Sequence, residues 1–415
     1  MNTKSEMSNA PIIALSGYGI SVTVEHGYLC VEDGVGNERR SARFARANSG
    51  IKRVVVLGHS GIISFEALRW LSGIGASFIH IDNDAEIITA SGVIGLDDAR
   101  LRRAQAAALN NGIGLAIARD LMSRKLKGQI DVLGWFQNPP SLFLKLKIAR
   151  AKAREADSID ELRFAEGEGA RAYWYAWRTL PVRFKCSEVN RVPEHWLTFG
   201  SRSSPLSRPS PRRAVNPANA LLNYVYAIVE AETRIASIAV GLDPAIGLMH
   251  SDLRARDSLA CDLMEAIRPQ ADEFVLELIK NRVFKKADFF ETREGICRLL
   301  PPLNREIAET ADKWRKLIGP VAEEVAQKLF KAKASSKIQN SSLAFAKYRL
   351  PTPLTGINRS IGRMLPIESI ESTNGTNQQS RKTYSKRPSL KLDCIRCGKQ
   401  IDGKHRMYCN LCLSG

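Results

Sequence analysis

Residues 52–81, KRVVVLGHSGIISFEALRWLSGIGASFIHI, hold two apolar runs of strand length on either side of a helical segment. The runs KRVVVL and SFIHI are typical of buried strands. Between them, Ser64 occupies an N-cap position ahead of apolar residues at helical spacing. Upstream, residues 20–32 (ISVTVEHGYLCVE) alternate around a turn-like His-Gly pair. These patterns predict a β-rich N-terminal domain over residues 1–92, with one helix packed on its sheet.

After Gly92 the hydrophobic period becomes helical. Helical patterns cover residues 101–133, 141–155, 219–240, about 257–283 and 302–333, and a long basic loop rich in Pro, Ser and Arg covers 181–218. We therefore predict an α+β fold, in which the β-rich domain is followed by a larger all-α catalytic domain over residues 93–334. The polar composition of residues 335–392 predicts a flexible basic linker, and residues 393–415 form a separate small module.

Composition limits the classes of function. The chain has 415 residues, of which 44% are hydrophobic, and its 61 Lys and Arg against 43 Asp and Glu give a net charge of +18. A polyanionic partner, most commonly nucleic acid, follows from this charge, although charge for solubility alone is the alternative. No apolar run reaches membrane-spanning length, and the first residues lack the apolar core of a signal peptide. We expect a cytoplasmic protein without a membrane partner.

The cysteines near the end of the sequence are spaced for a metal. CIRC and CNLC, separated by eleven residues, place four thiols as two C-x2-C pairs: Cys394, Cys397, Cys409 and Cys412. A tetrahedral four-thiolate zinc site has this spacing, and so short a segment has no core without metal. We predict a structural zinc ribbon, with a redox pair of thiols as the alternative.

Residues 250–269, HSDLRARDSLACDLMEAIRP, hold the candidate catalytic groups. On a helix, Asp262 and Glu265 share one face beside an apolar stripe, and a partly buried carboxylate needs an arginine or a metal ion as countercharge. Oxygen ligands with one imidazole, from His250, suit Mg²⁺ or Mn²⁺. The alternatives are a histidine with a structural role and a carboxylate network paired by Arg254, Arg256 or Arg268.

A second acidic candidate lies upstream in AEGEGARAYWYAW, residues 165–177. Glu166 and Glu168 precede a helical pattern there. Acidic residues in a first helical turn are ordinary complements of the helix dipole, so these two glutamates alone indicate little.

Four segments carry a resemblance to a known family. LGHSGIISFEALRWL, EGEGARAYW, NPANALLNYVYA and GLDPAIGLMHSDLRARDSLACDLMEAIRP follow one another in this order. In this they closely resemble the CRISPR-associated endonuclease/integrase family, the catalytic subunit of the machinery that captures new spacers. The resemblance runs from about residue 12 to about residue 330 and leaves out the cysteine module and its linker.

The resemblance assigns roles to particular residues. It implies one divalent-metal site, for Mg²⁺ or Mn²⁺, formed by Glu166, His250, Asp262 and Glu265. Tyr173 and Trp174 fix the register, and Glu168 falls where the family has a non-acidic residue. Glu265 falls where the family often has aspartate. Residues near bound DNA would include Tyr226 and Arg268, and the basic loop adds its own arginines: Arg202, Arg208, Arg212 and Arg213.

The resemblance also implies a reaction and partners. The 3′-hydroxyl of a captured double-stranded DNA fragment would attack a phosphodiester of the CRISPR repeat, and water in its place would nick DNA. The family forms homodimers, and two dimers are bridged by a small ferredoxin-like second subunit. Two other functions remain open: a transposon-encoded integrase with the same core, and a non-catalytic DNA-binding scaffold.

Overall fold

The computed structural model describes residues 11–34, 39–47, 49–92, 98–136, 140–200, 213–250, 257–335, 392–393 and 400–401. Residues 1–355 form one compact unit and residues 356–415 a second. In the second unit the described residues are the strands β11 (Leu392–Asp393) and β12 (Gln400–Ile401), which pair antiparallel. The boundaries expected at residues 92, 334 and 392 stay predictions.

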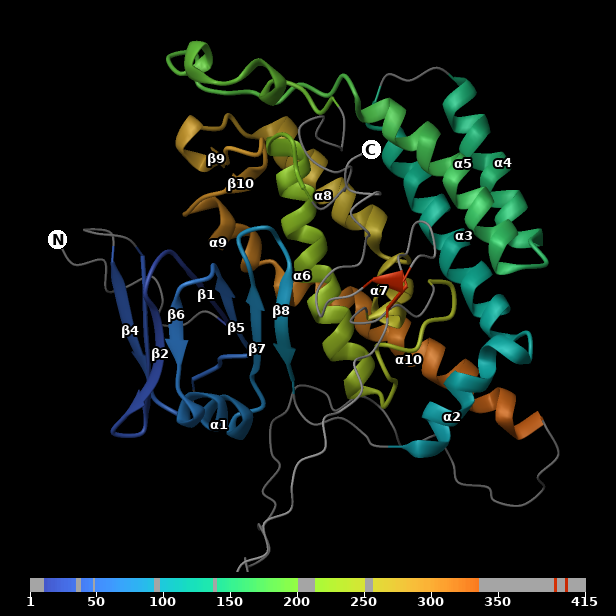
Figure 1. Ribbon diagram of the computed structural model, residues 1–415, viewed down its shortest axis with the longest axis horizontal. Helices are drawn as coiled ribbons and strands as arrows, with labels where there is room; N and C mark the ends of the chain where they lie inside the picture. The colour runs from blue at the N-terminus through green and yellow to red at the C-terminus, as the bar shows by residue number, and fades with distance from the viewer. Residues whose placement is uncertain are drawn as a thin grey trace, which may run out of the picture. The chain divides into compact units, whose positions relative to one another are not determined.

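The N-terminal part holds two four-stranded sheets (Figure 1). The first has the order β1-β5-β7-β8, with β1 (Ile12–Ser16), β5 (Arg53–Leu57) and β7 (Ser77–Ile81) parallel and β8 (Ile87–Ser91) antiparallel. The second has the order β4-β3-β2-β6: β4 (Arg40–Phe44), β3 (Tyr28–Asp33), β2 (Ile20–Glu25) and β6 (Gly61–Ile63). Helix α1 (Phe65–Gly73) begins after Ser64, whose hydroxyl accepts from the Ala67 N–H. The β-rich part and its helix are confirmed, but the expectation of a single sheet is wrong.

The alternation of side chains explains why two sheets form. In β1, Ile13 and Leu15 enter the core that the second sheet and α1 share, whereas Ile12 and Ala14 enter the larger core of the helical part. The first sheet is therefore covered on both faces, and its strands are continuous apolar runs. The second sheet has a single covered face, as the alternating burial of β2 shows.

The helical part follows. Its helices are α2 (Ala99–Ala107), α3 (Ile113–Leu133), α4 (Pro140–Glu155), α5 (Ile159–Trp177), α6 (Pro217–Ala239), α7 (Ser258–Met264), α8 (Arg268–Asn281), α9 (Leu303–Ala308) and α10 (Ala311–Ser335). Short 3₁₀ turns cover Ala108–Asn110, Val189–Arg191, Glu194–Trp196 and Lys286–Asp288. The α+β class is confirmed. The all-α expectation for residues 93–334 is wrong in one detail, because β9 (Phe289–Glu291) and β10 (Cys297–Leu299) form a hairpin.

Three of the expected helices are each interrupted. The helix expected over 101–133 divides into α2 and α3, with the 3₁₀ turn Ala108–Asn110 between them. The helix expected over 257–283 divides into α7 and α8, because Pro269 has no N–H to donate to the Glu265 carbonyl and stands in the first turn of α8 instead. The helix expected over 302–333 likewise divides into α9 and α10. The helix expected over 219–240 is confirmed as α6, with the Asn216 side chain accepting from the Asn219 N–H as its N-cap.

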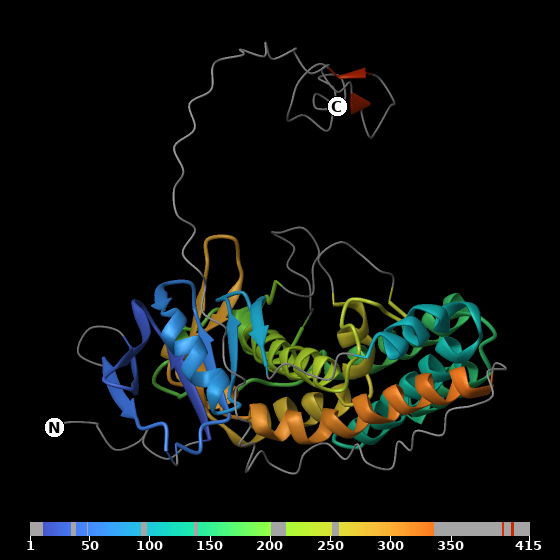
Figure 2. The same ribbon diagram turned by 90° about the horizontal axis from the view of Figure 1, so that it is seen from below.

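Helix α6 connects the two parts. It lies beside β8 and packs against α8 and α10, and almost all of its side chains are buried (Figures 1 and 2). Arg53 of β5 makes two contacts with the Glu232 carboxylate of α6, at 2.6 and 2.9 Å, and both side chains are buried. On the far side of α7, helices α3, α4 and α5 pack on one another (Figure 1). The expected basic loop is irregular over its described residues 181–200 and 213–216, and Trp196 and Phe199 anchor it in the core.

Candidate functional site

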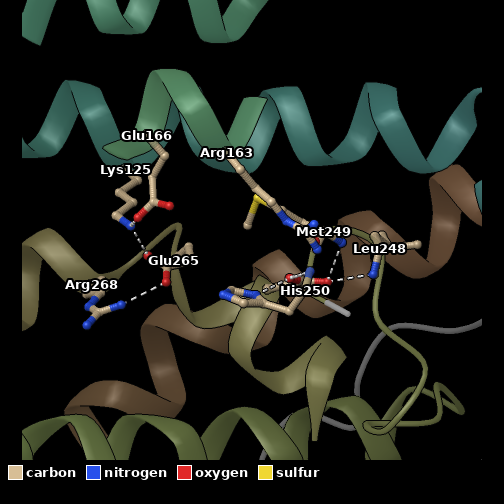
Figure 3. A network of polar contacts seen from close by, with 9 residues as sticks. Lys125, Arg163, Glu166, Leu248, Met249, His250, Glu265 and Arg268 are labelled. Atoms are coloured by element: carbon tan, nitrogen blue, oxygen red, sulfur yellow. Dashed lines mark hydrogen bonds and ion pairs between the residues drawn. The ribbon is translucent and has the colours of Figure 1, made fainter. Parts of the chain in front are cut away.

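The predicted ligands come from three parts of the chain, which meet between α3 and α6. Glu166 lies in the middle of α5, Asp262 on α7, and Glu265 at the residue that ends α7. His250 is the last described residue of the segment that leads from α6 toward α7. Figure 3 shows Glu166 and Glu265 on one side of the site and His250 on the other.

Glu166 and Glu265 converge on one cation. The Nζ atom of Lys125, on α3, lies 2.6 Å from Oε1 of Glu166 and 2.7 Å from Oε2 of Glu265 (Figure 3). The side chains of Lys125 and Glu265 are each 4% exposed, and that of Glu166 is 33% exposed. Two carboxylates thus face one positive charge: that of Glu265 is buried, and that of Glu166 is partly open to solvent.

Glu265 is held ionised. Burial favours its neutral form, but the charges of Lys125 and Arg268 outweigh this effect and lower the pKa of Glu265 to about 2. Arg268 Nη1 lies 2.8 Å from Oε1 of Glu265. Oε2 is buried and has no hydrogen bond of good geometry, although the Lys125 ammonium is close to it. The short distance shows that Oε2 and the Lys125 ammonium are in charge contact.

Asp262 has a different environment. Its carboxylate is fully buried and accepts from the backbone N–H groups of Leu248, Met249 and His250 at 2.6, 2.9 and 2.9 Å. Oδ1 also lies 2.5 Å from Nδ1 of His250. Four donors therefore surround one carboxylate, and Asp262 fixes the segment that carries the histidine.

This contact determines the tautomer of His250. Because a carboxylate has no hydrogen to donate, Nδ1 is the donor in the contact with Oδ1 of Asp262, and Nε2 of the neutral ring keeps its lone pair. A carboxylate that orients the other ring nitrogen is the usual support of a metal-ligating histidine. The imidazole extends toward the side on which Glu265 lies (Figure 3).

The donor set fits a hard divalent cation. Carboxylates of Glu166 and Glu265 and Nε2 of His250 are ligands that Mg²⁺ and Mn²⁺ accept, and the buried Oε2, which faces a cation without a well-aligned hydrogen bond, fits the same chemistry. Among the described residues, no three His, Cys, Asp or Glu side chains lie close enough together to hold a metal ion. Within that part of the chain the Lys125 ammonium stands between the two glutamates instead.

Among the remaining predicted residues, Arg268 contacts Glu265 of this centre directly, whereas the others have contacts of their own. Glu168 faces Lys152 of α4 at 2.8 Å near the surface. Arg268 stacks over the Tyr226 ring with its guanidinium carbon 4.4 Å from the centroid, and the Tyr226 hydroxyl donates to the buried Asp272. Arg213 is half-exposed and lies 3.9 Å from Glu294. Outside the described residues lie Arg202, Arg208, Arg212 and Arg254, Arg256, as well as Cys394, Cys397, Cys409 and Cys412.

Sequence reasoning missed one charged residue of the site, Lys125, and one buried carboxylate that contacts Tyr226, Asp272. Lys125 stands on the apolar face of α3 with Leu121, Met122 and Leu126, and a lysine in such a stripe is itself a sign of a buried ion pair. Asp272 accepts from the hydroxyls of Tyr173 and Tyr226, and nothing in its sequence neighbourhood indicates these contacts. Arg268 was considered as a partner of Glu265, and this pairing is present.

The fold and the site define a class of protein with a two-sheet N-terminal part and a helical part that carries carboxylates beside a histidine. The family model for CRISPR associated protein Cas1 matches residues 13–313 of this chain. The chain belongs to the Cas1 family.

Individual relatives agree with this assignment. A CRISPR-associated endonuclease Cas1 of Archaeoglobus fulgidus is 29% identical over 306 residues, which cover 69% of this chain and 83% of the relative. One of Rhodospirillum rubrum is 36% identical over 170 residues, or 41% of this chain and 44% of the relative. A solved casposase bound to its integration product has a TM-score of 0.64 at 23% identity, covering 77% of this chain and 91% of the other. A Cas1 protein of Thermotoga maritima has a TM-score of 0.59 at 21% identity, covering 76% and 97%.

Proposed function

We propose that this protein is a divalent-metal-dependent DNA endonuclease and integrase that inserts captured DNA fragments as new spacers into a CRISPR array. Membership of the Cas1 family and relatives named as endonucleases support the nuclease activity. The observation that carries the proposal is the convergence of the Glu166 and Glu265 carboxylates on one cation beside an oriented His250.

The roles of the residues follow from their contacts. Glu166, Glu265 and Nε2 of His250 would hold Mg²⁺ or Mn²⁺, which when bound supplies positive charge to the phosphate as its negative charge develops. Asp262 acts by holding His250 in position rather than as a ligand, because its lone pairs face four donors. The 3′-hydroxyl of the captured fragment attacks the phosphodiester, and the 3′-oxygen of the cleaved strand departs with a proton.

The charge of the chain supports a DNA partner. A net charge of +18 suits the phosphate backbone, and the arginines of the 201–213 stretch would position DNA without reading much sequence. Relatives of known structure include a complex of a Cas1-containing protein with Cas2, which aligns with a TM-score of 0.59 at 16% identity. We propose a homodimer with a small ferredoxin-like partner of this kind, working in the cytoplasm, and a zinc ion at the four C-terminal thiols. Among the described residues no helix is long and apolar enough to cross a membrane.

Strand transfer tests the proposal. Purified protein should join a DNA fragment to a branched or repeat-containing target with Mn²⁺ or Mg²⁺ and be inactive with a chelator. Glu166→Ala and His250→Ala should abolish transfer, since each removes a ligand without opening a cavity in the core. Glu168→Ala is the matched control, because Glu168 lies two residues away on the same helix and pairs only with a surface lysine. Activity in Glu166→Ala would contradict the assignment.

The choice of DNA target separates the other functions. The fold is similar to that of a casposase bound to its integration product, and the same fold can serve more than one function, so a transposon-encoded integrase is the second candidate. Such an enzyme would join transposon ends rather than fragments at a CRISPR repeat. A non-catalytic scaffold would bind DNA and nick none of these substrates with any divalent metal.

A further inference from the structure

Lys125 is an unusual residue for its position. Its side chain is 4% exposed, and its ammonium contacts the two carboxylates that the proposed function assigns to the metal. A lysine is almost never buried unless it is paired, because its ammonium is strongly hydrated at the surface. The two carboxylates therefore require a positive charge between them, which either the lysine or a metal ion can supply.

Close helix packing determines where Lys125 stands. A Cβ atom on Gly128 would lie 2.6 Å from Cβ of Pro269, so α3 meets the first turn of α8 at this glycine. A Cβ atom on Gly169 would lie 2.7 Å from Cδ2 of Leu126, so α3 and α5 are equally close. On α3, both contacts lie within the turn that follows Lys125, at Leu126 and Gly128. The backbone of Lys125 is thus fixed relative to Glu166 and Glu265 by packing, independently of the ion pairs.

We propose that the Lys125 ammonium occupies the position of the divalent metal between Glu166 and Glu265, and that a metal ion binds by displacing it. This inference rests on the proposed function, and it adds a residue that sets how tightly the metal is held. In the metal-free protein the ammonium keeps the two carboxylates converged. The long, flexible lysine stem allows the charged end to leave while the backbone stays in place.

Charge balance supports displacement. Glu166 and Glu265 carry two negative charges, which Lys125 and Arg268 neutralise without any metal. A divalent ion added to this set would face the Lys125 ammonium at contact distance in a partly buried site, where like charges repel strongly. Arg268 can remain, because it contacts the other oxygen of Glu265, Oε1. Oε2, which faces the ammonium without a good hydrogen bond, is the atom that a metal ion would use.

The test measures metal binding directly. Mn²⁺ is titrated into the full-length, metal-free protein by calorimetry, with free Mn²⁺ followed by electron paramagnetic resonance. Lys125→Met keeps the apolar stem and removes the competing charge, so its Kd for Mn²⁺ should fall at least about tenfold. The thermal midpoint of the metal-free variant should fall, because Glu166 and Glu265 both lose the contact with the Lys125 charge, and Mn²⁺ should raise it by more than in wild type.

Two further variants keep the test decisive. Lys152→Met removes a lysine that pairs with Glu168 nearby on the surface, and it should bind Mn²⁺ as wild type does. Lys125→Gln is neutral but keeps a polar hydrogen-bond donor, so it is measured as well in case Lys125→Met does not fold. Unchanged or weaker Mn²⁺ binding in the folded Lys125 variants would overturn the inference alone. Absence of Mn²⁺ binding in wild type and variants would overturn the proposed metal site together with it.

Discussion

Replacing Asp262 with Asn should inactivate the protein through the tautomer of His250. An asparagine side chain offers one acceptor oxygen, whereas the Asp262 carboxylate receives three backbone N–H groups and Nδ1 of His250. If the oxygen keeps the N–H groups of Leu248 and Met249, the new NH₂ faces His250. The ring can then accept at Nδ1 only by moving its hydrogen to Nε2.

The expected loss of stability follows from the number of N–H donors that lose their acceptor. In this least costly arrangement the partly buried backbone N–H of His250 loses its partner, which costs at most about 1–3 kcal/mol of unfolding free energy. The opposite orientation leaves two N–H groups unpaired and costs roughly twice as much. A hydrogen on Nε2 removes the lone pair that would bind metal, so we expect strand transfer to fall by about 10–100-fold or more, as for other residues that support metal-ligating histidines.

Urea unfolding of the metal-free protein and single-turnover strand transfer with Mn²⁺ measure the two effects. Asp272→Asn is the control, since Asp272 is also a buried carboxylate with two hydroxyl donors but does not contact His250. Wild-type stability together with wild-type activity in Asp262→Asn would refute the role of Asp262 in holding the N–H groups of residues 248–250 and the tautomer of His250. Full stability with complete loss of Mn²⁺ binding would instead make Asp262 a direct ligand.

Four further outcomes are expected. Because the pKa of Glu265 is lowered to about 2, its ionisation stabilises the metal-free fold fully above its ordinary value of 4.5, and this contribution is lost as pH falls toward 2; the difference in unfolding free energy between wild type and Glu265→Gln should shrink over that range. Glu232→Ala should cost about 3–5 kcal/mol in urea unfolding, because it leaves Arg53 buried without its partner, and a loss under 1 kcal/mol would contradict this. Replacing Arg208 and Arg212 by Ala should reduce the salt slope of DNA binding by about 0.9 per lost phosphate contact, and an unchanged slope would exclude those contacts. Elemental analysis should find about one zinc ion per full-length chain and none after truncation at residue 335, while strand transfer on a branched substrate persists.

The sequence alone determined the class of fold. Apolar runs of strand length followed by helical periodicity predict an α+β chain, and the strand KRVVVL and the helix after Ser64 lie where the pattern placed them. Local chemistry was sufficient there, because capping and side-chain alternation act between near neighbours. It was insufficient at Pro269, where the apolar stripe continues across a break and α7 and α8 are two helices.

Only the tertiary structure decided how the carboxylates divide their roles. The sequence pattern places Asp262 and Glu265 on one helix face. In the structure Asp262 accepts from backbone N–H groups, whereas Glu265 contacts Lys125, which lies 140 positions before it in the chain. The sequence could not indicate this, because the contact depends on how α3, α5 and α7 pack, and packing brings together residues with no local relation. Because a buried carboxylate must be paired with the donors or cations that the fold places beside it, these different surroundings give Asp262 and Glu265 different roles.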